Sequence, residues 1–339
     1  MNEKYSIEER CRKILEDNGG MVADKAKTIL LEDPALKDLR SPLEFISKNW
    51  RDLTPALMRL SCEAVRGRAD ETNDVAIAMS LMNLSFYIWD DIVDNARFRS
   101  FRSTLYGKFG EGTALVIGGL SSAKAFSILN ELPMDKEKRQ KINKLIWELW
   151  AKMAQAETVV LTLQGKENSP ARKKFWKIKM EATDLETWLK IGAIIGGGSE
   201  NEIKHLGEYG LCLGIVLELI KDFRISINLT AELGGKISNG KLPYSILWAS
   251  QRSKSIRTNL DLAYKKPIEQ IYIKKIVQDM LTTKVLDHIA KNIKRYSKKA
   301  KDELSLLKTN NATQTLHYII DAQPRLFRES LSMFRAQES

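Results

Sequence analysis

Residues 76–102 read AIAMSLMNLSFYIWDDIVDNARFRSFR, a long apolar run that ends in aspartates and is followed by arginines. The run contains no Pro or Gly and its apolar residues recur at helical spacing, which predicts one long helix. Asp90 and Asp94 are four residues apart, so their carboxylates share one helix face with Asp91 beside them. Like charges at this spacing repel by about 0.2–0.5 kcal/mol. The cluster indicates either a bound Mg2+, which favours carboxylate oxygens, or a charged helix end without a ligand.

Composition limits the possible function classes. The chain has 339 residues, of which 43% are hydrophobic, and can therefore bury a large core. Its three cysteines show no CxxC spacing and its three histidines do not cluster, which argues against a zinc site and against a Ser-His-Asp centre. The charged N-terminus lacks a signal segment, and the apolar runs are shorter than the roughly 18 residues of a spanning helix. We expect a cytoplasmic protein without a transmembrane segment.

The net charge of +11 favours an anionic partner, such as a phosphorylated small molecule, an anionic lipid or a nucleic acid. The densest basic stretch is Lys291–Lys301, KNIKRYSKKAK. It could be a nucleic-acid patch, but Ile289, Ile293 and Tyr296 supply an apolar stripe through it. Such a pattern is more typical of the solvent-exposed face of a helix, and we expect no nucleic-acid partner.

The remainder of the chain also reads as helices, and no alternating strand pattern occurs. Near the N-terminus we expect helices over residues 7–16 and 21–31, separated by a break at Gly19-Gly20. After the aspartates, a break at Gly107, Gly110 and Gly112 should precede an apolar helix over residues 113–129. The prediction is an all-α protein with one domain over residues 1–339, in which residues 1–40 form peripheral helices.

The order of these features resembles the trans-isoprenyl diphosphate synthase, or polyprenyl synthetase, family. An apolar helix ends in DDIVD, an arginine follows five residues later, and a Gly-rich break leads into GKFGEGTALVIGGL. Further on, LGIVLELIKDF precedes LGGKISNGKLP, and the similarity extends from about residue 42 to residue 324. The resemblance implies a single isoprenoid-synthase-type helical bundle around a central cavity, a homodimer, and Mg2+ with an allylic prenyl diphosphate at two aspartate-rich motifs. Terpene synthases share this fold.

The first aspartate motif is intact in this sequence. By resemblance, Asp90, Asp91 and Asp94 are metal ligands and catalytic residues, and Arg99 binds the substrate diphosphate. Other residues implied by the resemblance fall into two groups: further contacts to the allylic diphosphate, and residues lining the cavity one or two turns before the aspartates. The first group is Lys179, Lys236 and Lys241, and the second is Asn83, Phe86, Tyr87 and Trp89.

The site for a second diphosphate, that of isopentenyl diphosphate, has lost most of its expected contacts. Ser100 replaces the second of two adjacent arginines. Aligned on Pro55, the two basic positions of an earlier motif read Arg51 and Thr54, and Asn83 replaces a His or Gln. Each charge-assisted contact that is lost weakens binding by roughly 1.5–3 kcal/mol.

The second aspartate motif is damaged, since residues 221–225 read KDFRI. Only Asp222 retains a carboxylate, and Glu218 lies one turn before it. Both are candidate metal ligands. Lys221 cannot bind Mg2+, but its ammonium group can neutralise a phosphate oxygen.

Three functions remain open. The leading prediction is a Mg2+-dependent terpene synthase, a lyase that ionises an allylic prenyl diphosphate and cyclises or quenches the carbocation. The second is a trans-prenyltransferase with an unusual acceptor site. The third is a catalytically silent regulatory subunit of a prenyl diphosphate synthase.

Overall fold

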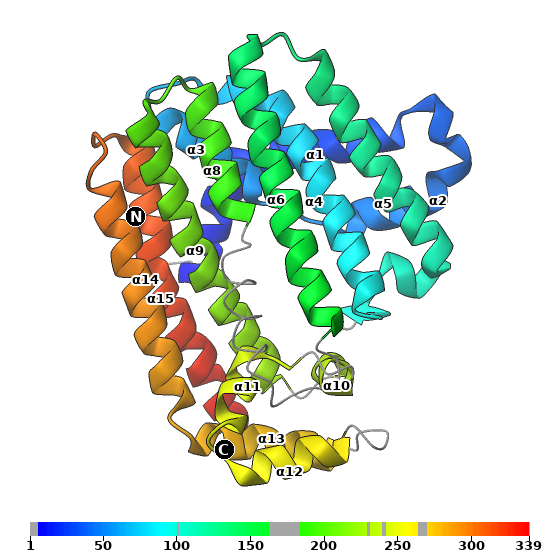
Figure 1. Cartoon of the computed structure of the whole chain (residues 1–339), viewed down its shortest axis with the longest axis vertical. Coiled ribbons are helices and arrows are strands. Elements are labelled where there is room, and N and C mark those ends of the chain that lie inside the picture. The colour runs from blue at the N-terminus through cyan, green and yellow to red at the C-terminus, as the bar shows by residue number, and fades with distance from the viewer. Residues whose placement is uncertain are drawn as a thin grey trace. The chain divides into compact units, whose positions relative to one another are not determined.

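The computed structural model describes residues 6–99, 102–162, 184–228, 231–238, 242–263 and 270–338. These residues form helices almost throughout (Figure 1), which confirms the all-α prediction. The elements run in the order α1 Ile7–Leu31, η1 Pro34–Leu39, α2 Arg40–Asn49, α3 Thr54–Ala64, η2 Ala69–Thr72, α4 Asn73–Val93, β1 Phe98–Arg99, β2 Arg102–Ser103, α5 Leu105–Glu131, α6 Lys136–Thr162, α8 Asp184–Ile195, α9 Glu200–Ile227, α10 Ala231–Ser238, α11 Tyr244–Ser250, α12 Lys254–Ala263, α13 Gln270–Thr282, α14 Val285–Leu304 and α15 Asn311–Glu338.

The described contacts divide the chain into two compact units. The first comprises residues 1–143, 188–207 and 306–316, and the second comprises residues 144–187, 208–305 and 317–339. Several boundaries fall inside helices, so that α6, α8, α9 and α15 each contribute residues to both units. The expectation of one domain, with residues 1–40 at its periphery, stays a prediction.

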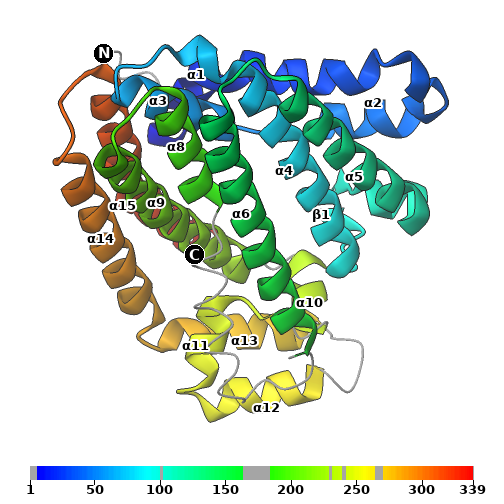
Figure 2. The ribbon, with the colours of Figure 1, turned by 45° about the horizontal axis from the view of Figure 1, so that its top comes forward.

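Helix α4 is the central element of the first unit. Its residues are apolar on all sides, and those from Val75 to Met82 are buried, as expected for a helix with neighbours around it. Helix α5 packs along it, and the two lie side by side in both views (Figures 1 and 2). Ser85 Oγ donates to the Gly118 carbonyl oxygen at 2.8 Å. A Cβ on Gly118 would lie 2.5 Å from Trp89 Nε1, so this glycine permits the close contact.

Among the described residues, α5 is long and apolar enough to cross a membrane, judged by length and composition alone. Core helices pass the same test. The buried residues of α5, among them Ala114, Ile117, Ser121 and Ala125, recur at helical spacing and include the contact with α4 at Gly118. We therefore interpret the face of α5 that carries these residues as part of the core of the first unit, whereas Leu115, Val116 and Phe126 of the same helix are exposed.

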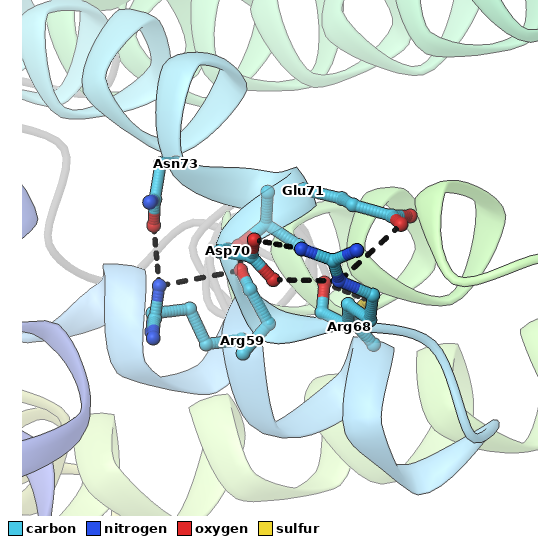
Figure 3. Close-up of polar contacts among 8 residues, drawn as sticks. Arg59, Arg68, Asp70, Glu71 and Asn73 are labelled. Carbon is cyan, nitrogen blue, oxygen red and sulfur yellow. Dashed lines mark hydrogen bonds and ion pairs between the residues drawn. The ribbon is translucent and has the colours of Figure 1, made fainter.

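A polar cluster fixes the turn from which α4 starts (Figure 3). Arg59 of α3 donates to the Ala69 carbonyl oxygen at 3.2 Å and to the side-chain oxygen of Asn73, the first residue of α4. Arg68 pairs with Asp70 at 2.7 Å and with Glu71 at 4.0 Å. These contacts hold the short helix η2 and thereby set the residue at which α4 begins.

The structure corrects one prediction about chain breaks, confirms another at a single glycine and adds one element. Helix α1 continues through Gly19-Gly20, because Gly19 faces α3 where a Cβ would lie 2.5 Å from the Ala56 nitrogen. Gly19 thus serves close packing and does not end the helix. The predicted glycine break before residue 113 is confirmed at Gly110, whose φ of 82° and ψ of 171° separate two helical segments within α5. Gly107 and Gly112 are helical, so the first of these segments begins already at Leu105. The sequence pattern also missed the two-residue hairpin of β1 and β2, which pairs Phe98 with Ser103.

Close packing at Gly192 provides a test of this arrangement. A Cβ on Gly192 of α8 would lie 2.2 Å from the Met58 carbonyl oxygen of α3. Because backbone cannot yield as a flexible side chain can, Gly192→Ala should lower the free energy of unfolding by about 1–3 kcal/mol or more, measured by urea denaturation. Gly119→Ala is the matched control, since no atom lies within 4 Å of its Cβ position. It should be neutral or stabilising by up to about 1 kcal/mol. Equal effects of the two substitutions would contradict the packing of α8 on α3.

Candidate active site

The aspartate motif lies at the C-terminal end of α4, where the backbone turns sharply. Asp94 caps the helix, and Asn95 adopts the left-handed conformation with φ of 50°. Asn tolerates this conformation better than most residues. The Asn95 N–H donates to the Ile92 carbonyl at 3.0 Å and the Ala96 N–H donates to the Asp91 carbonyl at 2.8 Å. This pair of bonds is a Schellman motif, which ends the helix and redirects the chain.

The segment after this turn folds back over the helix end. Thr104, the N-cap of α5, donates its hydroxyl to the Ala96 carbonyl at 2.7 Å and accepts from the Gly107 N–H at 2.9 Å. Its own N–H donates to the Arg97 carbonyl at 2.9 Å. A Cβ on Gly107 would lie 2.1 Å from the Arg97 carbonyl oxygen, so glycine is required for this approach. The intervening hairpin places Arg99 back against the aspartates.

Arg99 binds two of the three aspartates. Its Nη2 pairs with Asp90 Oδ2 and its Nε pairs with Asp91 Oδ1. The guanidinium carbon also lies 5.2 Å from the centre of the Tyr87 ring, in cation–π range. Burial alone would lower the pKa of Arg99, but Asp90 and Asp91 together raise it above its usual value. One cation thus holds both carboxylates at the end of α4.

Asp91 is the most buried of the three aspartates, with a side-chain exposure of 1% against 41% for Asp90. Burial raises the pKa of Asp91 to about 6, although Arg99 acts in the opposite direction. Its Oδ2 atom is buried and has no hydrogen-bond partner among the described residues. A buried carboxylate oxygen without a donor is costly, and this one would gain from a cation or a donor supplied by a ligand.

The fit of this site to Mg2+ depends on its donors and on how they are arranged. The carboxylates of Asp90 and Asp91 are suitable donors, and the unpartnered Oδ2 atom of Asp91 supports the assignment. Within the described ranges, no three His, Cys, Asp or Glu side chains are grouped closely enough to hold an ion. Mg2+ commonly binds through one or two carboxylates and completes its shell with water and substrate phosphates. The residues therefore fit a metal shared with a substrate and do not form a complete protein cage.

The neighbouring residues predicted to line a cavity lie on α4 in varied surroundings. Trp89 lies against Gly118 of α5 and forms an edge contact with Phe86, with 6.3 Å between ring centres. Tyr87 lies beneath Arg99. The roles of Phe86, Tyr87, Asn83 and Trp89 in a cavity, and that of Asp94 as a ligand, stay predictions.

Thr54 and Asn83 occupy two positions at which the resemblance implies contacts to a second diphosphate. Both lie beside a carboxyl group that sequence reasoning missed, that of Asp52. Asp52 is 6% exposed and accepts from the Thr54 N–H at 2.9 Å and from the Thr54 hydroxyl. Asn83 Nδ2 donates to Thr54 Oγ1 at 3.1 Å and approaches Asp52 Oδ2 at 3.5 Å. The only available sequence signal was an acidic residue between the two positions aligned with basic residues. We define Asp52, Thr54 and Asn83 as the Asp52 network.

The predicted residues of the second motif form two separate contacts in the second unit. Lys221 Nζ lies 3.2 Å from Glu218 Oε2, one turn earlier on α9. Asp222 is 7% exposed and accepts from the Ser245 N–H and hydroxyl, both at 3.3 Å. Lys236 lies on α10, half-buried, whereas Lys179, Lys241 and Ser100 lie outside the described residues. The metal and diphosphate roles assigned to this group stay predictions.

Removal of Arg99 should expose the cost of burying Asp91. Arg99→Met leaves that carboxylate without its cation, which should lower the free energy of unfolding by roughly 3–5 kcal/mol in metal-free buffer at pH 8. The double variant Asp91→Asn/Arg99→Met removes the uncompensated charge and should recover a large part of the loss. Urea denaturation of the wild type, both single variants and the double variant gives the coupling energy. Additive effects would contradict the ion pair.

The Asp52 network makes a separate prediction about pH. Burial raises the pKa of the Asp52 carboxyl, and the hydrogen bonds from Thr54 and Asn83 only oppose this effect. The folded state therefore retains the proton at a pH where the unfolded chain, with a pKa of about 3.9, has lost it. The resulting stabilisation is complete below the unfolded pKa and is lost as the pH rises through the folded pKa.

Asp52→Asn abolishes this titration and keeps an oxygen that can accept from Thr54. Relative to the wild type, the variant should become progressively more stable as the pH rises from about 4 to 8. Urea denaturation of both proteins at several pH values measures the difference. Curves that remain parallel over the whole range would show that Asp52 has the same pKa in the folded and unfolded states.

Comparison with known proteins places this arrangement in a family. The sequence profile described as polyprenyl synthetase matches residues 37–280. A short chain isoprenyl diphosphate synthase from Methanothermobacter thermautotrophicus is 24% identical over 84% of this chain and 88% of its own length. Geranylgeranyl pyrophosphate synthase 12 from Arabidopsis thaliana is 30% identical over 61% of each chain.

Solved structures show the same fold. A polyprenyl synthase from Caulobacter crescentus, crystallised with calcium and isoprenyl diphosphate, superposes with a TM-score of 0.81 at 17% identity, over 96% of this chain and 99% of its own. A geranylgeranyl pyrophosphate synthetase from Pyrococcus horikoshii gives a TM-score of 0.78 at 21% identity, over 93% and 97% of the two chains. Because the family profile covers more than half of the sequence, this chain belongs to the polyprenyl synthetase family.

Proposed function

We propose that this protein is a Mg2+-dependent trans-prenyltransferase that acts on an allylic prenyl diphosphate and has an altered acceptor site. The observation that carries the proposal is the family match over residues 37–280 together with an intact aspartate cluster at the end of α4. The relatives named above are prenyl diphosphate synthases, which favours a transferase over the terpene synthase that the sequence motifs alone predict.

The chemistry assigned to the first unit follows from its charges. Asp90 and Asp91 would hold Mg2+, which when bound neutralises a diphosphate leaving group. Arg99 is already placed against both carboxylates, and a substrate diphosphate offers its guanidinium a second set of acceptor oxygens. We infer that Arg99 shares its donors between the aspartates and the diphosphate.

The acceptor site is proposed to disfavour a second diphosphate. Of the positions expected to hold that group, Arg51 is still basic, but its side chain is 73% exposed and lies 4.0 Å from Glu16. Asp52 adds a buried carboxyl group beside it, and this group already accepts hydrogen bonds from Thr54 and Asn83. Protonated or ionised, a carboxyl group cannot replace the missing cations, because it offers no positive charge to an anion. We therefore expect isopentenyl diphosphate to bind weakly, so that an acceptor without a diphosphate is a reasonable alternative substrate.

The Asp52 network also favours a second candidate function, that of a terpene synthase which transfers to no acceptor. Incubation with allylic diphosphates of ten, fifteen, twenty and twenty-five carbons and Mg2+, with and without isopentenyl diphosphate, separates the possibilities. We expect slow elongation that requires isopentenyl diphosphate and has a high KM for this substrate. Hydrocarbon or alcohol formed equally well without it would favour the terpene synthase, and no turnover would favour the regulatory subunit.

A cation restored in the acceptor site should strengthen its binding of isopentenyl diphosphate. The double variant Asp52→Asn/Thr54→Arg removes the buried carboxylate and adds a guanidinium at the position aligned with the lost arginine. The KM for isopentenyl diphosphate should fall about tenfold or more, the equivalent of one charge-assisted contact. Gln314→Arg adds the same charge on an exposed part of α15 and should leave the KM unchanged. An unchanged KM in the double variant would argue against this location of the acceptor site.

Dimerisation and a cytoplasmic location are further parts of the proposal, and both rest on the family resemblance. Size-exclusion chromatography coupled to light scattering measures the first directly.

A further inference from the structure

A basic groove in the second unit takes no part in the chemistry described above. Its volume is about 830 Å3, and its lining comes from the end of α11, the start of α12, the end of α13 and the start of α14. These elements lie together in both views (Figures 1 and 2). Clefts of roughly 300–1,000 Å3 are the size that proteins use for small ligands. The basic and aromatic lining residues are Trp248, Arg252, Lys254, Lys284, His288 and Lys291, and the one acidic lining residue is Asp287.

Arg252 is held in place by an aromatic ring. Its Nη1 donates to the Trp248 carbonyl at 3.0 Å, and its guanidinium carbon lies 3.5 Å from the centre of the Trp248 ring. Trp248 in turn stacks on His288, with 4.6 Å between ring centres and 21° between ring planes. Because packing fixes the guanidinium plane, its remaining N–H groups are available to an acceptor at little entropic cost.

His288 adds a hydrogen-bonded ring to the lining of the same groove. Its Nε2 lies 2.7 Å from the Tyr244 hydroxyl and 3.2 Å from Asn292 Nδ2. Asn292 Nδ2 also donates to the His288 carbonyl at 2.9 Å, so the amide nitrogen faces the ring and Nε2 must be an acceptor. The ring proton therefore lies on Nδ1. Burial, Arg252 and Lys291 all lower the pKa of His288.

The charges of the groove are unbalanced. Arg252, Lys254, Lys284 and Lys291 face a single lining carboxylate, that of Asp287. In the part of the chain that the structure describes, no carboxylate lies within ion-pair distance of these four cations. Cations gathered around one concave surface repel each other unless an anion joins them. The amides of the first turn of α14 begin at the same place, since Lys284 is its N-cap.

We propose that this groove binds a small anion through a phosphate or diphosphate group. Arg252 supplies a planar fork for two phosphate oxygens, while Lys284 and Lys291 act as point charges from the first turns of α14. A nucleic acid fits the groove less well. Its bases would need an aromatic face for stacking, and the Trp248 ring is already stacked on His288 and covered by Arg252. The proposal does not depend on the function proposed for the first unit.

Titration calorimetry with inorganic diphosphate, in low salt with EDTA, tests the proposal. The double variant Lys284→Gln/Lys291→Gln removes two groove cations. Lys298→Gln/Lys308→Gln is the matched control, because it removes the same two charges from exposed positions that do not line the groove. Binding elsewhere on the chain is common to all three proteins, so the differences between them report on the groove. We expect the Kd of the double variant to rise about tenfold or more and that of the control to change less than about twofold.

Two further arms identify the source of the phosphate. Sedimentation with phosphatidylcholine vesicles, with and without phosphatidic acid, tests a lipid headgroup. Loss of vesicle binding in the double variant assigns the groove to a lipid phosphate, and loss of soluble diphosphate binding alone assigns it to a free phosphorylated molecule. If the double variant binds both as tightly as the wild type, the proposal is wrong.

A third arm uses a single-stranded oligonucleotide. Groove-dependent binding of this probe, without groove-dependent binding of diphosphate or vesicles, would also overturn the proposal in favour of a nucleic acid. Because both substituted lysines are exposed, the variants should fold. Should the double variant fail to do so, Lys291→Gln alone, compared with Lys298→Gln, decides the question in the same titration.

Discussion

The ion pair between Arg99 and Asp91 connects the fold of the first unit to its candidate chemistry. Asp91 is buried because α4 is apolar on all sides and packs along α5, and a buried carboxylate requires a cation. Arg99 reaches it only because Asn95 ends the helix in a left-handed turn and Gly107 lets the chain return. The turn at Asn95 and the return of the chain at Gly107 therefore place the guanidinium group of Arg99 beside the two aspartates. The geometry that stabilises the helix end is also the geometry that presents Asp90 and Asp91 to a ligand.

The first unit contains a second buried carboxyl group, that of Asp52. Asp52 lies among positions where the family resemblance leads one to expect cations, and Thr54 and Asn83 have become its hydrogen-bond partners. The resemblance predicts a basic cluster that attracts an anion. This chain has instead an acidic residue whose hydrogen bonds are made to Thr54 and Asn83. By resemblance, a synthase that binds isopentenyl diphosphate would have cations at these positions. This contrast is the reason why we propose an altered acceptor site together with an ordinary ionisation of the allylic substrate.

The second unit distributes its charges differently. Lys221 is neutralised by Glu218, and Asp222 accepts hydrogen bonds from Ser245. By contrast, the cations around Trp248 and His288 face a single lining carboxylate, although they occupy a concave surface. The cations that give the chain its net charge of +11 therefore differ in how far nearby carboxylates neutralise them. The exposed pairs contribute little energy, whereas an unbalanced concave cluster creates a field that an anion can enter.

The sequence by itself determined the all-α class, the long helix over residues 76–93 and the position of Asp90 and Asp91 together at its end, because helical spacing is a local property. It did not predict that Arg99 pairs with both carboxylates, since the resemblance gave Arg99 only a contact to the substrate diphosphate. It did not determine the role of Gly19, which continues a helix because Ala56 of another helix approaches it. Nor did it reveal the Asp52 network or the basic groove. Their members come from separate helices, and burial and charge balance depend on which segments meet. Only the tertiary structure decides those contacts, because the energy of a charge depends on its surroundings and not on its position along the chain.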